Sequence, residues 1–172
     1  LGHGGCGKTT FLEAALLATG VISRMGKVED GNTVSDYDKM EVERGYSINT
    51  SVVPILWKEN KINFIDTPGY FDFVGEVNAA LRAAEAAVIM VDAGSGIQVG
   101  TEAAWKACER YKTPRFIVIN KRDKDEFDFY KTFGELKDKF GEKLIPFSWP
   151  LSAEIDEELK DCLLYTSDAA DE

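Results

Sequence analysis

The 172-residue sequence has few cysteines, fewer basic than acidic residues, and no long apolar run. Its three cysteines, Cys6, Cys108 and Cys162, are odd in number and scattered. They therefore favour neither a disulfide framework nor a zinc site, and they fit a reducing, cytoplasmic compartment. No stretch approaches the roughly 20 apolar residues that a membrane-spanning helix needs. The net charge of −10 repels phosphate backbones, so direct binding of DNA is not expected.

Short apolar runs alternate with longer amphipathic stretches along the chain. This pattern predicts an α/β fold of three layers, in which helices cover both faces of a mostly parallel central sheet. Pro54 lies inside one expected strand and predicts an edge position or a bulge there. The expected strands are Ser51–Trp57, Lys61–Asp66, Ala87–Asp92, Arg115–Asn120 and Leu144–Trp149, and the expected helices are Leu12–Ala18, Val74–Ala86, Gln98–Tyr111 and about 127–140.

A glycine-rich segment opens the chain. Residues 2–9 read GHGGCGKT and satisfy the phosphate-loop pattern G-x-x-x-x-G-K-S/T. Glycines let such a loop wrap closely, so that backbone N–H groups face phosphate oxygens, and the following helix adds its positive end. Lys8 is expected to reach the β- and γ-phosphates, and the Thr9 hydroxyl to coordinate Mg²⁺. The alternative is a glycine-rich turn before a helix. The predicted nucleotide contacts here are Gly2, His3, Gly4, Gly5, Cys6, Gly7, Lys8, Thr9 and Thr10.

A second motif follows the expected strand Lys61–Asp66. Asp66, Thr67, Pro68 and Gly69 sit at a strand end, where ligands of parallel sheets collect. Asp66 is expected to hold Mg²⁺ through a water, and the Gly69 N–H to contact the γ-phosphate. Proline and glycine also mark ordinary turns, which is the alternative for this motif taken alone.

A third motif ends the apolar strand RFIVIN. Asn120, Lys121, Arg122 and Asp123 match N-K-x-D. The carboxylate of Asp123 can accept two hydrogen bonds from the N1–H and 2-amino groups of guanine, and adenine lacks both donors. Lys121 is expected to lie along the base, and Asn120 to tie this loop to the phosphate loop. A solvated charge run is the alternative, but three motifs in this order favour guanine.

The segments GHGGCGKT, EVERGYSIN, DTPGYFDF and NKRD together resemble, in order and spacing, the GTPase domain of the elongation factor G family. The likeness covers residues 1 to about 155. It implies the P-loop NTPase fold of a translation-factor G-domain, GTP or GDP and Mg²⁺ as ligands, and hydrolysis of GTP to GDP and phosphate. It also implies a cytoplasmic monomer that acts on the ribosome, mainly through other domains. Ribosomal protection proteins of the tetracycline-resistance type share much of the set and remain an alternative.

The resemblance assigns roles to further positions. Ser47 occupies the place of the Mg²⁺-binding switch I threonine and keeps its hydroxyl, whereas Tyr46 stands where isoleucine is usual. Tyr70 replaces the histidine that normally follows D-T-P-G and orients the attacking water. The expected switch segments are about 24–51 and 66–76. The predicted catalytic residues are Lys8, Gly69 and Tyr70, and the predicted metal ligands are Thr9, Ser47 and Asp66.

Two other functions stay open on the sequence. A phenol, unlike an imidazole, does not become a cation by taking up a proton, so Tyr70 is compatible with a guanine-nucleotide-binding switch that hydrolyses weakly. A phosphate-loop ATPase or kinase is the other, and N-K-R-D argues against it.

The ends of the chain carry separate expectations. Residues 1–161 are expected to form the GTP-binding domain, truncated at both ends and without its first strand. Residues 162–172 resemble translated adapter sequence. Ser152-Ala153 resembles a guanine-contacting motif, but its surroundings also resemble the start of the subdomain inserted in elongation factor G.

Overall fold

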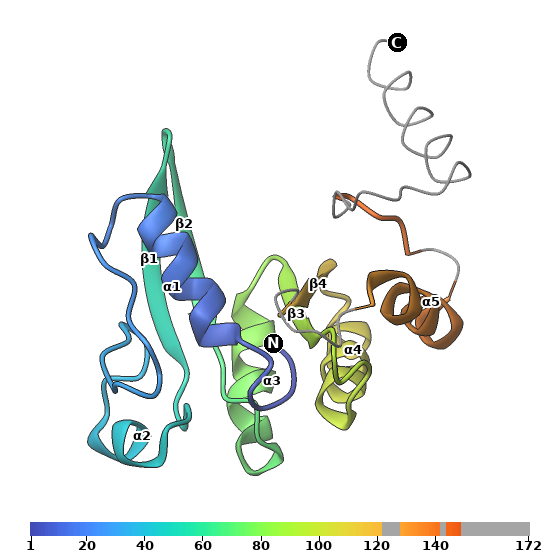
Figure 1. Cartoon of the computed structure of the whole chain (residues 1–172), viewed down its shortest axis with the longest axis horizontal. Helices are drawn as coiled ribbons and strands as arrows, with labels where there is room; N and C mark the ends of the chain where they lie inside the picture. Colours follow the sequence, from blue (N-terminus) through green and yellow to red (C-terminus); the bar gives the residue numbers. More distant parts are fainter. Residues whose placement is uncertain (122–127, 142–143, 149–172) are drawn as a thin grey trace. The chain divides into compact units, whose positions relative to one another are not determined.

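A computed structural model describes residues 1–121, 128–141 and 144–148 of the chain (Figure 1). The chain divides into two compact units, Leu1–Leu136 and Lys137–Glu172, and each is taken by itself. Every strand of the described residues belongs to the first unit, as do the described parts of the three motifs. No helix in the described ranges is long and apolar enough to cross a membrane.

Strands β1 (Ser51–Trp57) and β2 (Asn60–Asp66) form an antiparallel hairpin within a residue of the expected bounds. Lys58 in the connecting turn adopts a left-handed backbone conformation with φ of 52°. Among the described residues, β1 pairs with β2 alone and without a bulge. Pro54 therefore lies on an edge strand, where its missing N–H leaves no ladder bond unmade.

Strands β3 (Ala87–Asp92) and β4 (Arg115–Asn120) match the predicted bounds and pair in parallel, with Ile89 opposite Ile117. β3 is almost wholly buried, as an apolar run covered on both faces should be. β4 is only half-buried, and its Phe116 is 57% exposed, so the expectation of full burial was wrong for this strand.

The described strands form two separate two-stranded sheets rather than one continuous sheet. Leu1 and Gly2 run beside β3: the Met90 N–H donates to the Leu1 carbonyl at 2.9 Å, and Gly2 makes a single parallel bridge to Met90. These two residues are too few to form a ladder. No described strand pairs with both β2 and β3, and this explains the break between the two sheets.

The helices agree with the expectation at their cores and differ at their ends. Helix α1 begins at Lys8, directly from the phosphate loop, and α3 ends at Ala83 because Ala84 is extended. Helix α2 and the 3₁₀ helix η1 were not predicted, because six and three residues are too few to show a period. The helices are α1 (Lys8–Ala18), α2 (Lys39–Arg44), η1 (Phe71–Phe73), α3 (Val74–Ala83), α4 (Val99–Tyr111) and α5 (Phe129–Phe140).

The weak strand expected at Leu144–Trp149 is not supported, because the described residues 144–148 contain no strand. Ile145 and Phe147 are exposed at 80% and 92%. Their apolar character alone suggested a strand, but both residues are largely exposed. The adapter-like segment 162–172 and Ser152-Ala153 lie outside the described residues, so those interpretations stay predictions.

One apolar cluster fixes the start of α1 relative to the hairpin. Leu12 and Leu16 on α1 are buried against Val53 and Ile55 of β1, with Phe64 of β2 packed beside them. Full burial of such a side chain is worth about 1.5–3 kcal/mol. Because the phosphate loop leads directly into α1, the cluster also fixes the position of this loop relative to the hairpin. Figure 1 shows α1 lying along the hairpin.

Cys108 on α4 is fully buried, as expected of a small core residue. Burial raises the pKa of its thiol above the ordinary value. It is a packing residue and not a reactive thiol.

Candidate nucleotide-binding site

The phosphate loop closes on itself through Lys8. Its ammonium donates hydrogen bonds to the carbonyl oxygens of Gly2 and His3, at 3.2 and 2.9 Å. Gly7, the N-cap of α1, has φ of 93°, and a Cβ there would collide with the amide nitrogen of Asn120. Glycine is therefore required at this position both by backbone conformation and by the close approach of the N-K-x-D loop.

Two of the three predicted metal ligands lie together. The Thr9 hydroxyl donates to Asp66 Oδ2 at 2.8 Å, and both side chains are buried. The Ser35 hydroxyl donates to the same carboxylate oxygen at 3.0 Å. Sequence reasoning missed Ser35, because a serine in a polar loop gives no pattern. Within the described residues, no group of three or more His, Cys, Asp or Glu side chains could hold a metal.

The third predicted metal ligand, Ser47, is bonded elsewhere. Its hydroxyl donates to Asp36 Oδ1 at 2.6 Å. Asp36 is 5% exposed, and its Oδ2 has no protein partner among the described residues. Burial raises the pKa of Asp36, the negative charge of Asp66 also raises it, and the hydrogen bond from Ser47 opposes these effects. Asp36 was not predicted, since nothing in the local sequence indicates that it comes close to Asp66.

The D-T-P-G segment packs tightly on the phosphate loop. A Cβ on Gly69 would lie 2.8 Å from the Gly4 nitrogen and would also collide with the Lys8 ammonium. Only glycine permits this approach. The predicted catalytic residues Lys8 and Gly69 are thus neighbours, and Tyr70 lies next to them, with its ring against Gly4. Thr67 and Pro68 are buried.

The N-K-x-D motif is joined to the phosphate loop by Asn120, whose amide donates to the Cys6 carbonyl at 3.0 Å. This is the contact expected from the sequence. Lys121 has φ of 62°, and its ammonium pairs with Asp92 at 2.7 Å. Asp92 ends β3 and was not predicted to contribute. Asp123 lies outside the described residues, so its contact with a base stays a prediction.

Two buried glutamates hold the segment between α1 and β1. Glu13 on α1 accepts the N–H groups of Gly26 and Val34 at 2.7 and 2.6 Å. Glu41 on α2 accepts those of Ile48 and Asn49, both at 2.9 Å. Charged acceptors make the stronger backbone hydrogen bonds, so these two carboxylates order the expected switch I segment next to the metal ligands.

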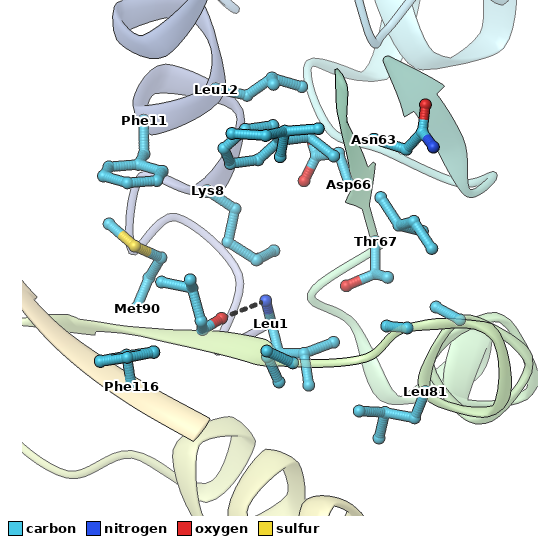
Figure 2. A pocket seen from close by; sticks show the side chains of 18 residues that line it. Leu1, Lys8, Phe11, Leu12, Asn63, Asp66, Thr67, Leu81, Met90 and Phe116 are labelled. Carbon is cyan, nitrogen blue, oxygen red and sulfur yellow. Dashed lines mark hydrogen bonds between the residues drawn. The ribbon is translucent and has the colours of Figure 1, made fainter. Parts of the chain in front are cut away.

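An apolar cavity of about 300 Å³ adjoins the site, between α1, β2, α3 and β3. Figure 2 shows the polar side chains of Lys8, Asp66 and Thr67 among its lining, together with the apolar side chains of Phe11, Leu81 and Met90. Its walls offer too few donors for phosphates. This cavity is therefore not suited to phosphate groups.

The fold and site define a class of protein. A glycine-rich loop runs into a helix, a carboxylate follows a strand beside it, and an N-K-x-D motif is tied to that loop, as in phosphate-loop guanine-nucleotide-binding domains. The family model described as "Elongation factor Tu GTP binding domain" matches residues 1–169, and the chain belongs to this family.

Individual relatives agree. The chain is 43% identical over 152 residues to "Elongation factor G" of Granulibacter bethesdensis and 41% identical over 152 residues to that of Gluconobacter oxydans, matching 88% of this chain and 22% of each relative. A crystal structure from Thermus thermophilus superposes with a TM-score of 0.84 at 42% identity, over 88% of this chain and 23% of that one. This match confirms the predicted α/β fold. The chain spans about a fifth of the length of the curated relatives it matches.

Proposed function

We propose that this chain is the guanine-nucleotide-binding domain of an elongation factor G-like GTPase, which hydrolyses GTP to GDP and phosphate on the ribosome. The observation that carries the proposal is the Asn120–Cys6 hydrogen bond of 3.0 Å, which fixes the base-selecting motif to the phosphate loop. Kinship with proteins named elongation factor G, at 41–43% identity, supports the ribosome as partner. The protein is expected to act as a cytoplasmic monomer.

Binding of the phosphates begins with Lys8. Its ammonium exchanges the carbonyl oxygens of Gly2 and His3 for the β- and γ-phosphate oxygens, while loop N–H groups and the positive end of α1 face the same charge. Asp123 then accepts the two guanine donors that adenine lacks. The base is selected by this carboxylate, and the phosphates supply most of the affinity.

The residues present fit a magnesium ion. Buried hydroxyl and carboxylate oxygens are the hard donors that Mg²⁺ prefers, and Thr9 and Asp66 already lie 2.8 Å apart. Thr9 would hold the ion directly, and Asp66 through water. Ser47 would join them by giving up its bond to Asp36. When bound, Mg²⁺ neutralises the charge that builds up on the phosphates.

Tyr70 and Gly69 are placed to act on the reacting water. The Gly69 backbone packs on Gly4 and Lys8, so its N–H would lie close to the γ-phosphate of a nucleotide bound to the loop. The Tyr70 hydroxyl can hydrogen-bond a water, but it cannot supply a cation at neutral pH. Positioning and charge neutralisation therefore carry most of the catalysis, and contact with the ribosome orders the water.

A second candidate, favoured specifically by Tyr70, is a guanine-nucleotide switch with weak hydrolysis. The Tyr70→His variant separates the two: a sharply raised turnover supports the weak-hydrolysis switch, and an unchanged rate counts against it.

The test of the main proposal is GTP hydrolysis by the complete protein, with and without ribosomes, together with competition between GTP and ATP for binding. We expect ribosomes to stimulate hydrolysis and ATP not to compete. Equal affinity for ATP and GTP, or hydrolysis that ribosomes leave unchanged, would refute it.

A further inference from the structure

Two tyrosines from separate segments meet beside the phosphate loop. Tyr46 follows α2 and precedes the predicted metal ligand Ser47, whereas Tyr70 directly follows Gly69. Their ring centroids are 4.7 Å apart with the planes inclined at 54°. This lies within the distances at which tilted aromatic rings attract one another beyond simple burial.

The Tyr70 ring is placed against the phosphate loop. The three atoms nearest to a Cβ built on Gly4 all belong to that ring, and the closest, Cζ, is 3.3 Å away. The preceding residue, Gly69, packs on the Gly4 backbone. One side of the Tyr70 ring is therefore set by the loop, although 47% of the residue remains exposed.

Tyr46 is held from its own side. The guanidinium of Arg44 donates to the Tyr46 hydroxyl at 3.1 Å. On the C-terminal side, Ser47 is bonded to Asp36, and the Ile48 N–H is bonded to Glu41. The ring of Tyr46 is thus presented by an anchored segment and not by a free loop.

We propose that Tyr46 is a positioning residue for Tyr70. The two rings form an aromatic bridge (Tyr46 and Tyr70) that joins the segment carrying Ser47 to the segment carrying Gly69. The bridge holds the Tyr70 hydroxyl at the edge of the loop, where the terminal phosphate of a bound nucleotide would lie. The catalytic meaning of the bridge rests on the proposed function, whereas the coupling of the two segments does not.

The coupling is tested by amide hydrogen exchange of residues 66–76 in the complete protein. Tyr46→Ala removes the ring, and exchange in 66–76 should become about two- to tenfold faster, the range that an aromatic pair contributes. Tyr46→Phe keeps the ring and loses only the hydroxyl, so protection should stay near wild type. Tyr37→Ala is the matched control, because Tyr37 lies in the same segment and is 75% exposed.

Three outcomes would each overturn the bridge. The exchange rate of residues 66–76 could stay unchanged in Tyr46→Ala, or it could rise equally in Tyr37→Ala. It could also rise as much in Tyr46→Phe as in Tyr46→Ala. If Tyr46→Ala unfolds the domain, Tyr46→Leu takes its place with the same expectation, because leucine retains apolar bulk without a ring.

The catalytic meaning is tested by kinetics with ribosomes. Tyr46→Ala should lower kcat for GTP more than it changes KM, and Tyr46→Ala/Tyr70→Ala should be no slower than Tyr70→Ala alone. If the kcat of the double variant fell by the product of the two single effects, positioning through Tyr70 would be contradicted. If the wild-type protein hydrolyses no GTP while the exchange result holds, the proposed function fails and the bridge stands.

Discussion

The hydroxyl of Thr9 and the carboxylate of Asp66 come from segments 57 residues apart, yet they share a buried hydrogen bond of 2.8 Å. Local motifs predicted both residues for one site, because each motif lies at a junction of strand or helix with loop. The same reasoning missed Ser35, Asp36 and Asp92. These three act through contacts between distant segments, and no local pattern encodes such contacts.

Replacing Thr9 by alanine removes the hydroxyl that we propose as a direct oxygen donor for Mg²⁺. We expect GTP affinity in millimolar Mg²⁺ to fall by at least about tenfold, since even outer-shell partners of a metal contribute that much. Thr9→Ser keeps the hydroxyl and should retain most of the affinity. Titration with a fluorescent guanine nucleotide, with Mg²⁺ and with EDTA, measures both. An equal loss in EDTA would contradict a role through the metal.

Gly69 and Gly75 offer a matched pair of glycines in adjoining segments. A Cβ on Gly69 would meet Gly4 and Lys8, whereas one on Gly75 meets no atom within 4 Å. Gly69→Ala should therefore cost about 1–3 kcal/mol of unfolding free energy through overpacking. It should also weaken GTP binding. Gly75 lies in helix α3, so Gly75→Ala should raise the unfolding free energy by about 0.5–1 kcal/mol. Urea unfolding followed by tryptophan fluorescence compares them; similar effects in both variants would refute the close approach.

At the scale of elements, the apolar runs predicted most strands well, because strands packed in the interior consist largely of apolar residues. Strands β1, β3 and β4 begin and end where expected. The sequence did not predict helix α2, because its apolar residues Met40 and Val42 are exposed and do not form an apolar face on the helix. It is specified instead by a capping box between Asp38 and Glu41.

Glu41 belongs to this scale, because one side chain organises a whole segment. Besides capping α2, it accepts the N–H groups of Ile48 and Asn49. Glu41→Ala should lower the unfolding free energy by about 3 kcal/mol or more, since it removes two hydrogen bonds to a charged group, each worth about 1.5–3 kcal/mol. The exposed Glu43 on the same helix is the control, and Glu43→Ala should change stability by less than about 0.5 kcal/mol. Denaturant midpoints of both variants measure the difference, and equal midpoints would exclude the anchoring role.

At the scale of the whole molecule, the fold class could be predicted because alternating strands and helices permit few arrangements. The division into two sheets could not, since it depends on how many residues lie beside β3, where the described residues near Leu1 form a single bridge, between Gly2 and Met90. The comparison with a solved structure at a TM-score of 0.84 places these strands in a known fold.

Nucleotide binding should stabilise the domain as a unit. GDP with Mg²⁺ at a hundredfold excess over its Kd adds about 2.7 kcal/mol to the folded state. For a domain of this size that raises the melting temperature by roughly 5–10 °C. ATP at the same concentration should give no shift, and EDTA should reduce the shift with GDP. Differential scanning fluorimetry measures all three, and a shift with ATP equal to that with GDP would contradict guanine selection.

The ammonium of Lys8, lodged on the carbonyl oxygens of Gly2 and His3, has a consequence for how a ligand is received. The loop does not have to become ordered when a phosphate binds. The Lys8 ammonium already holds the loop in a curved conformation. On binding, this ammonium would exchange two carbonyl oxygens for phosphate oxygens. The affinity gained from Lys8 is then the difference between its phosphate contacts and its two carbonyl bonds, without the added cost of ordering the loop.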